Sequence, residues 1–387
     1  MEIPAPVAPL ARRPARSLGD TTIQAGAVAL VAAALLLVSL TTVSNLQARG
    51  IPVGFEFLGD RAGFKIADTV LAFTPDDTYL RAIAVAVGNT LFLSLVVCLA
   101  ATVLGAPLGV ARLSRNPLVS ALAAGWVEAV RNTPPVLLLI FLYAFWSQAL
   151  PAEAPLEVLP GVLLSIRGLS VPKVSLEWSL PLVSLAIAAS LGACVLVRRA
   201  AGRLGPRTAG RVTSGFVLTL LGAWIVALSF MGGLAVEAPR VDGSAMIGGA
   251  RLTPEFATVG LGLTLYTAGF IAEIVRSGLL SVPRGQWEAA RALGLGEAQI
   301  LLRIIAPQML RVIVPPMASQ YINTVKNSTL AIAVGYSEFM TVMGTVINRT
   351  NHALEGTIII VAVYTAINLA LAAALEAFNR HVQLPGR

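Results

Sequence analysis

The sequence predicts an all-α fold, a polytopic bundle of about eight transmembrane helices. Hydrophobic residues make up 56% of the 387 residues and charged residues only 12%, whereas a soluble domain has roughly 25% charged residues. The apolar runs are also continuous, while the strands of a membrane barrel alternate over about ten residues. These two observations favour helices that cross a membrane.

A helix needs roughly 17 to 25 residues to cross a hydrocarbon core of about 30 Å. The first apolar run is longer than the roughly 7 to 15 residues of a signal-peptide core, so we expect a retained helix there. Eight runs qualify as spans: Ile23 to Val43, Ile83 to Val110, Leu118 to Leu150, Pro181 to Val197, Val212 to Val236, Phe256 to Gly278, Val312 to Gly335 and Thr357 to Phe378.

The distribution of arginines predicts the orientation, because cytoplasmic loops carry an excess of Lys and Arg. With the N-terminus inside, the inner segments hold 16 of the 28 basic residues, and most acids fall in the outer loops. Both termini are therefore expected in the cytoplasm. The net charge of +8 comes from arginines scattered over short loops, which favours contact with anionic lipid over binding of nucleic acid.

The spans divide the chain into three parts. Residues 1–79 comprise an N-terminal cytoplasmic tail, the first transmembrane helix and an outer loop that could form a small cap. Residues 80–380 form a transmembrane domain, in which 151–253 is an inserted region with two helices and a polar outer loop. Residues 381–387 form a cytoplasmic tail.

Ionisable side chains at membrane depth are costly, so each is a functional hypothesis. In Val127 to Phe141, Pro134 and Pro135 remove backbone donors and push Thr133 out of helical angles, which predicts a break in the third span. Glu128 and Arg131 beside the break are either a neutralised pair in a polar pathway or interfacial anchors.

A second polar stretch lies near the inner end of the sixth span. Ala268, Gly269 and Ala272 are small enough for close helix packing. Glu273 and Arg276 are three residues apart and can pair along one helix face. A structural role explains this pair as well as a functional one does.

The seventh span carries the longest polar stretch. Gln320, Asn323 and Asn327 recur at helical spacing, with Lys326 and Ser328 beside them. Lys326 is too deep in the span to be a snorkelling anchor. The stripe indicates a polar translocation pathway or, alternatively, a structural network between helices.

One short helical stretch is too polar to be a span. Trp287, Ala290 and Leu293 share a face, Gly294 occupies the position of a left-handed C-cap, and Gly296 allows a second helix to begin. A helix of about ten residues is only about 15 Å long, so it must lie across the cytoplasmic face.

This stretch resembles the EAA loop of ABC-transporter permeases, which reads Glu-Ala-Ala, three residues, Gly, nine residues and Ile-x-Leu-Pro. Only Ala306 departs from the pattern, where Leu is usual. The resemblance implies that the short helix docks into a groove of a separate ATP-hydrolysing subunit. The expected coupling residues are Trp287, Glu288, Ala289, Ala290, Arg291 and Gly294. Ala289 and Ala290 would allow close approach, and Glu288 and Arg291 would supply polar contacts.

Further segments resemble the polar amino-acid uptake branch of these permeases: "GNTLFLSL", "VEAVRNTPP", "LTLYTAGFIAEIVRSGLLSVPRGQWEAARALGL" and "VKNSTLAIAVGYSEF". The extra first span and the inserted region are similar to the larger permease of general L-amino-acid (Aap/Bzt-type) systems. The resemblance implies a type I importer permease core in the bacterial inner membrane. It also implies a dimer of ATP-binding subunits, a second and different permease subunit, a periplasmic substrate-binding protein and an L-amino-acid substrate.

The chain lacks a GxxxxGK[ST] phosphate loop, so we expect it not to be an enzyme. No cofactor is expected in this chain, with ATP and Mg²⁺ held by the partner ATPase. The alternative is a self-sufficient secondary transporter or channel, in which Lys326, Glu128 and Glu273 would be ion or proton groups. The candidate pathway residues are Glu128, Arg131, Thr133, Glu273, Gln320, Asn323, Lys326, Asn327 and Ser328.

Overall fold

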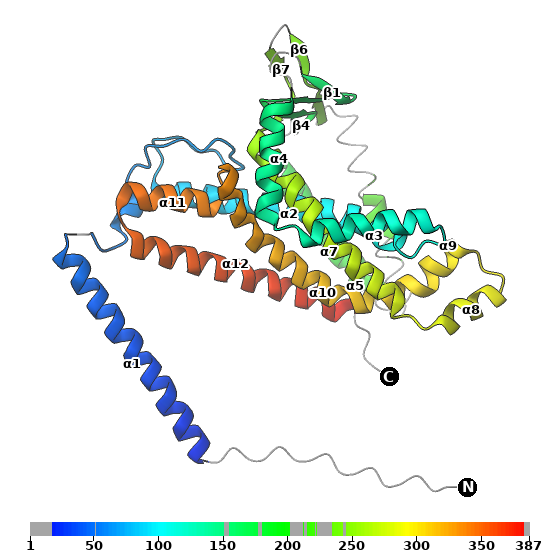
Figure 1. Cartoon of the computed structure of the whole chain (residues 1–387), viewed down its shortest axis with the longest axis horizontal. Helices are drawn as coiled ribbons and strands as arrows, with labels where there is room; N and C mark the ends of the chain where they lie inside the picture. Colours follow the sequence, from blue (N-terminus) through cyan, green and yellow to red (C-terminus); the bar gives the residue numbers. More distant parts are fainter. Residues whose placement is uncertain are drawn as a thin grey trace.

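The computed structural model is predominantly helical (Figure 1), and it describes residues 18–50, 52–150, 155–176, 180–201, 212, 215–220, 222, 234–242 and 245–382. Five of the described helices are long and apolar enough to cross a membrane, or six if one bent pair counts as a single span. The predicted helical fold class is confirmed. The fourth predicted span is occupied by α5 (Leu180–Ala201), while most of the fifth, Val212 to Val236, lies outside the described residues, as do both ends of the chain.

The first helix, α1 (Leu18–Ala48), covers the first predicted span and extends away from the other helices (Figure 1). The segment after it folds against the bundle, as the expected cap would. It contains a short 3-10 helix, η1 (Glu56–Gly59), and buries Phe57, Ala62 and Ile66 in a cluster with the first turns of the next helix. Asn89 holds this segment in place, because its side chain accepts from the backbone N–H of Val70 and donates to the Asp68 carbonyl.

Two long helices, α2 (Tyr79–Ala111) and α7 (Pro254–Leu280), pack side by side at the centre of the molecule. Their contact is close because Gly105 and Gly109 face α7. A Cβ atom on Gly109 would lie 2.5 Å from the backbone oxygen of Ala272, and one on Gly105 would lie 2.7 Å from that of Ala268. Ala268 and Ala272 are fully buried, which confirms the close packing predicted from the small residues of this span.

The third predicted span breaks where the two prolines predict. The helix α3 (Pro117–Asn132) ends before Thr133, and α4 (Pro135–Ala149) begins after it at an angle of 102°. Thr133 has extended backbone angles, and its hydroxyl donates to the Ala129 carbonyl. The local chemistry of proline is therefore sufficient to explain the bend.

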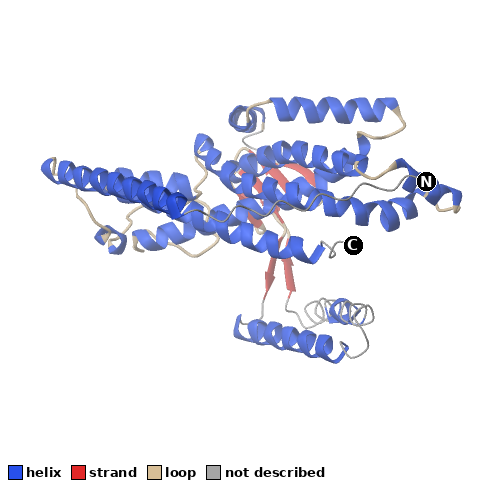
Figure 2. Cartoon of the chain, turned by 90° about the horizontal axis from the view of Figure 1, so that it is seen from below, coloured by secondary structure: helices blue, strands red, loops and turns tan. Residues whose placement is uncertain are grey.

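The inserted region contains short antiparallel strands that the sequence analysis described only as a polar loop. One sheet has the order β1-β2-β3-β8, while β4 pairs with β5 and β6 pairs with β7. Figure 2 shows the strands between the main bundle and the helical part of the insertion. The bounds are β1 (Leu156–Leu159), β2 (Val162–Ser165), β3 (Gly168–Val171), β4 (Lys173–Leu176), β5 (Leu234–Glu237), β6 (Arg240–Asp242), β7 (Ala245–Ile247) and β8 (Ala250–Leu252).

After α7 the chain makes a small helical loop and then returns along the bundle. The loop contains α8 (Arg284–Ala292), α9 (Glu297–Ile300) and one π-helical turn, η3 (Leu301–Ile305). The returning helix α10 (Ala306–Asn327) continues as a 3-10 segment, η4 (Ser328–Val334), and packs against α7, α12 and α2. The chain then forms α11 (Phe339–Thr350) and the long α12 (Ala353–Val382).

Candidate functional site

The loop helix α8 ends in a Schellman motif, which fixes its geometry. Gly294 has φ of +72°, the left-handed conformation predicted for this position. Its N–H donates to the Arg291 carbonyl at 2.9 Å, and the N–H of Leu295 donates to the Ala290 carbonyl at 3.3 Å. The nine-residue helix is too short to span a membrane, and Gly296 starts α9 directly after the turn, as expected.

The two alanines of the loop motif lie on different faces of α8. Ala289 is exposed, whereas Ala290 is only 2% exposed and belongs to a cluster with Val282, Ile300 and Ile305. This corrects the expectation that Ala290 contacts a partner, because its methyl group is covered by this chain. Leu293 leaves the face of Ala290 at the helix end and is 79% exposed.

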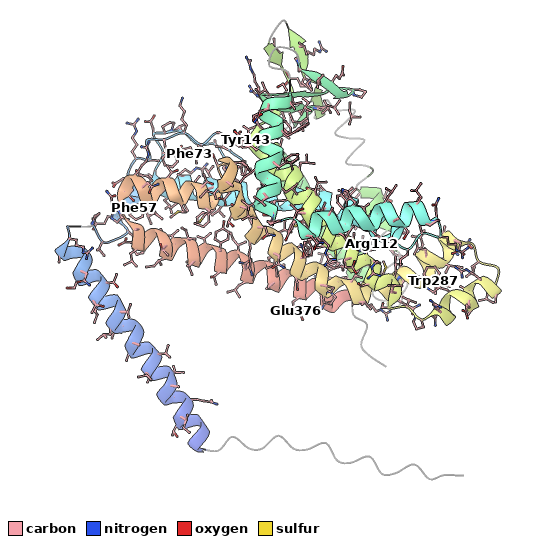
Figure 3. The ribbon with its side chains drawn as sticks, viewed as in Figure 1. Phe57, Phe73, Arg112, Tyr143, Trp287 and Glu376 are labelled. Atoms are coloured by element: carbon pink, nitrogen blue, oxygen red, sulfur yellow. The ribbon has the colours of Figure 1, made fainter. Side chains whose placement is uncertain are left out.

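An ion pair connects the two helices of the loop, and a ring contact links two residues of α8. The Arg291 guanidinium donates to Glu297 at 2.9 Å and lies 5.9 Å from the centroid of the Trp287 ring. Trp287 itself is half-buried against the loop cluster (Figure 3). Arg291 therefore joins α8 to α9 at the surface of the loop, where Glu288 is also exposed.

Three arginines meet at one carboxylate where α2, α3 and α7 come together. Glu273 accepts from Arg276 at 2.6 Å, which confirms the predicted pair, and it also accepts from Arg112 at the end of α2. Arg131 of α3 lies 3.7 Å away, and its guanidinium stacks over the Phe270 ring at 5.1 Å. Figure 3 labels Arg112 at this junction.

Glu128 and Thr133 do not join this cluster. Glu128 is exposed, and the ion pairs of the described residues do not include it, so the alternative of a Glu128–Arg131 pair is wrong. Arg131 turns toward Gly269 and Glu273 because the absence of a side chain at Gly269 leaves room for its stem, whose Cγ lies 3.1 Å from the position of a Cβ there. Thr133 is half-buried at the break between α3 and α4.

The polar stripe of α10 is divided between the interior and the surface. Gln320 and Ser328 are buried, Asn327 is half-buried, and Asn323 and Lys326 are exposed. Within the part of the chain that the structure describes, the side chains of Gln320, Asn323, Lys326 and Asn327 form no hydrogen bond or ion pair. Only Ser328 donates, to the Val325 carbonyl at 2.7 Å. The helix α10 thus presents polar side chains that have no partner among the described residues.

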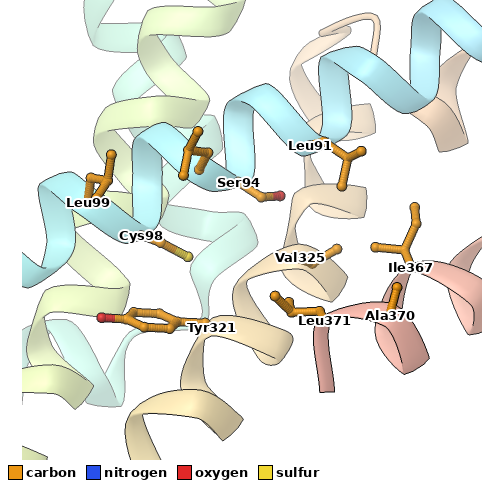
Figure 4. A pocket seen from close by; sticks show the side chains of 10 residues that line it. Leu91, Ser94, Cys98, Leu99, Tyr321, Val325, Ile367, Ala370 and Leu371 are labelled. Atoms are coloured by element: carbon orange, nitrogen blue, oxygen red, sulfur yellow. The ribbon is translucent and has the colours of Figure 1, made fainter. Parts of the chain in front are cut away.

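A pocket of about 490 Å³ opens on another side of α10, between α2 and α12 (Figure 4). Leu91, Leu95 and Leu371 are among the side chains that line it, and Tyr321 lies at its end. Ser94 lines it too, and its hydroxyl has no partner among the described residues. A pocket this apolar provides few contacts for a polar solute, and the polar residues of the stripe do not line it.

Two features of the centre were not identified from the sequence. Arg112 is one of the inner-segment arginines, and the sequence alone does not predict that it pairs with Glu273. Gly105 and Gly109 form a small-x-x-x-small pattern in an apolar helix, and this pattern could have predicted the contact between α2 and α7.

Comparisons with known proteins find relatives that cover most of the chain. The general L-amino acid transport system permease protein AapQ of Rhizobium johnstonii is 36% identical over 354 residues, 90% of this chain and 88% of that protein. The putative amino-acid ABC transporter permease protein YhdX of Escherichia coli is 38% identical over 89% of each chain. The glutamate/glutamine/aspartate/asparagine transport system permease protein BztB of Rhodobacter capsulatus is 34% identical, over 95% of this chain and 94% of that protein.

These matches confirm the resemblance to Aap/Bzt-type permeases, and they do not favour the alternative of a self-sufficient transporter or channel. The family model described as "Binding-protein-dependent transport system inner membrane component" matches residues 101–384. The chain belongs to this family of transport permease subunits.

Proposed function

We propose that this chain is the permease subunit of an ATP-driven L-amino-acid importer in the bacterial inner membrane, and that α8 receives the motion of a separate ATPase. One observation carries the proposal. The short helix α8 shares a buried cluster, including Ala290, Ile300 and Ile305, with Leu279 at the end of α7 and Ile313 in α10. A displacement of α8 would therefore move the ends of two spans, because packed interiors deform little.

The surface available to the ATPase is the exposed side of α8. Glu288, Ala289 and Leu293 lie there, and none of them contributes to the buried loop cluster. A small residue beside an exposed leucine suits a fitted apolar contact with a groove, and Glu288 can add a polar contact. Trp287 packs against the loop cluster, Gly294 forms the turn that ends the helix, and exposed Arg291 pairs with Glu297 of α9.

Several parts of the proposal come from the family and from the names of the relatives. The ATPase would be a dimer that holds ATP and Mg²⁺, so this chain needs no cofactor. A periplasmic binding protein would deliver the L-amino acid, and a second, different permease subunit would complete the membrane part. Both chain termini would lie in the cytoplasm, on the same side as α8.

The polar stripe of α10 is the proposed contribution to the translocation pathway. Exposed Asn323 and Lys326 would be costly against lipid, so we place them toward the second permease subunit and a water-filled route. Gln320, Asn327 and Ser328 extend the same stripe. Glu128 and Thr133 remain candidates at the α3–α4 break, whereas Arg131 and Glu273 are engaged with each other.

A matched pair of substitutions tests the coupling role. Ala289→Trp adds bulk to the exposed face, so the isolated chain should keep its thermal stability in detergent but lose copurification with the ATPase or ATP-driven uptake in proteoliposomes. Ala290→Trp overpacks the cluster under α8, which typically costs about 1 to 3 kcal/mol. It should therefore lower the thermal stability of the chain itself. Normal ATP-driven uptake by the stable Ala289→Trp protein would refute the assignment of α8 as the coupling helix.

A further inference from the structure

The arginine cluster at the junction of α2, α3 and α7 has more positive charge than this chain neutralises. Arg112, Arg131 and Arg276 surround Glu273, so three positive charges meet one negative charge and leave a net charge of +2. In the part of the chain that the structure describes, these three guanidinium groups have no other acidic partner within 4 Å. Like charges gathered in a partly buried place repel each other more strongly than in water. An anion from outside the chain would relieve this repulsion.

The hydrogen-bond donors of the cluster also outnumber its acceptors. Each guanidinium carries five N–H groups, while one carboxylate has about four acceptor sites. Among the described residues, the guanidinium groups of Arg112 and Arg276 donate only to Glu273, and that of Arg131 makes an ion pair with Glu273 but no hydrogen bond. The Nε atoms of Arg112 and Arg131 are buried and have no acceptor among the described residues. The cluster therefore has more hydrogen-bond donors than acceptor oxygen atoms among the described residues.

Two arginines of the cluster are partly exposed, so a group from outside the chain can reach them. The side chain of Arg112 is only 12% exposed, but those of Arg131 and Arg276 are 35% and 30% exposed. They can bind an external group while Arg112 and Glu273 hold the junction together. Guanidinium groups match the geometry of phosphate oxygens and bind them in a bidentate manner.

The position of the cluster indicates which phosphate is available. Arg112 directly follows the apolar helix α2, and Arg276 lies about one turn before the end of α7, on the side of the molecule where α8 lies. Basic pockets between transmembrane helices on the cytoplasmic side bind the headgroups of anionic phospholipids. We propose that Arg112, Arg131 and Arg276 form a binding site for the phosphate of an anionic phospholipid of the inner leaflet.

This inference rests on the proposed function only for the choice of leaflet, because α8 sets the cytoplasmic side. Lipid binding can be measured without nucleotide, ATPase or transport. Failure of the lipid site would therefore leave the coupling role of α8 untouched. Conversely, loss of the coupling role would not change the affinity of the cluster for a phosphate.

The test compares lipid binding by the purified full chain in detergent, using native mass spectrometry and thermal stability. Wild-type protein should retain and be stabilised by phosphatidylglycerol, but not by phosphatidylcholine or by inorganic phosphate. Arg131→Gln and Arg276→Gln should each weaken phosphatidylglycerol binding about tenfold, which corresponds to about 1.4 kcal/mol. Arg115→Gln is the matched control, because this arginine is 84% exposed, lies outside the cluster, and its loss should leave lipid binding unchanged.

Glu273→Gln separates lipid binding from a merely structural role. It removes the only carboxylate of the cluster and keeps all three arginines, so phosphatidylglycerol should bind several-fold more tightly even if the protein is less stable. A structural role alone predicts lower stability with no gain in binding. Equal binding of phosphatidylcholine, equal protection by inorganic phosphate, or an equal loss in Arg115→Gln would overturn the lipid site. Displacement of the lipid on adding the second permease subunit would assign the cluster to a protein carboxylate instead, and would overturn it too.

Discussion

Arg112, the residue that follows the last turn of α2, forms an ion pair with Glu273 in α7, across 161 positions of the chain. The pair depends on the close approach of the two helices. Gly109 lies against the backbone of Ala272, so the next residues of α2 arrive beside Glu273. Gly109 has no functional group of its own, but the close helix contact that it allows brings Arg112 and Glu273 together.

The first prediction concerns this helix contact. In Gly109→Ala, the added Cβ would lie 2.5 Å from the Ala272 carbonyl oxygen, and backbone atoms cannot move aside easily. We expect a loss of about 1 to 3 kcal/mol, seen as a lower melting temperature in detergent. Gly125→Ala is the control, because its Cβ would meet no atom within 4 Å and alanine favours a helix by roughly 0.5 to 1 kcal/mol. Equal stability of the two variants would contradict the close contact.

The second prediction concerns the turn after α8. Gly294→Val forces a β-branched residue into φ of +72°, which costs roughly 1 to 2 kcal/mol and opens the Schellman turn. We expect copurification of the ATPase to weaken while the spans stay folded. Gly285→Ala, within α8 and in open space, should leave copurification intact. The turn is dispensable for coupling if both variants copurify with the ATPase as the wild type does.

The third prediction concerns the polar stripe of α10. Asn323→Leu and Lys326→Met replace exposed groups that have no partner within the described chain, so the fold should be preserved. Amino-acid uptake in proteoliposomes should fall markedly while the complex still assembles. Leu369→Ala, at an exposed site on α12, should transport normally. Wild-type uptake in both stripe variants would remove α10 from the pathway and favour a structural network.

The fourth prediction concerns orientation. In a background with Cys98→Ala and Cys194→Ala, Gln299→Cys should react only with a reagent added from the cytoplasmic side. Asp76→Cys, in the outer segment before α2, should react from the periplasmic side, because its side chain is 76% exposed. Reversed labelling of the two positions would invert the topology.

The fifth prediction concerns a buried carboxyl group between η4 and α11, outside the apolar spans. Burial raises the pKa of Glu338 above its ordinary value of 4.5, although the N–H of Thr341 and the hydroxyl of Tyr364 donate to it. Ionisation then costs more in the folded chain than in the unfolded chain. The folded state therefore loses stability as the pH rises from 4.5 toward the raised pKa.

Thermal melting in detergent from about pH 5 to about pH 8 measures this effect. The stability advantage of wild-type protein over Glu338→Gln should shrink as the pH rises, and then level off. A difference that stays constant over this range would show that the carboxyl group does not titrate differently in the folded state.

Local chemistry explains what could be predicted from the sequence alone. Long apolar runs indicate membrane spans because of their length and composition alone. Pro134 and Pro135 interrupt a helix because they lack backbone N–H donors, whatever packs around them. Gly294 tolerates the left-handed angle that ends α8, and Glu273 and Arg276 are neighbours on any helix. Each of these features depends on residues a few positions apart, so no distant contact was needed to predict it.

Only the tertiary structure decided which groups meet across the chain. Ala289 and Ala290 are identical side chains, yet one is exposed and the other is buried, because α9 and η3 pack against one face of α8. Arg131 pairs with Glu273 and not with its neighbour Glu128, because α3 lies against α7 at Gly269. Each short strand of the inserted region likewise depends on hydrogen bonds to a neighbouring strand. Such contacts join residues that are far apart in the sequence. A pattern of neighbouring residues does not indicate which distant residues will lie next to each other in the fold.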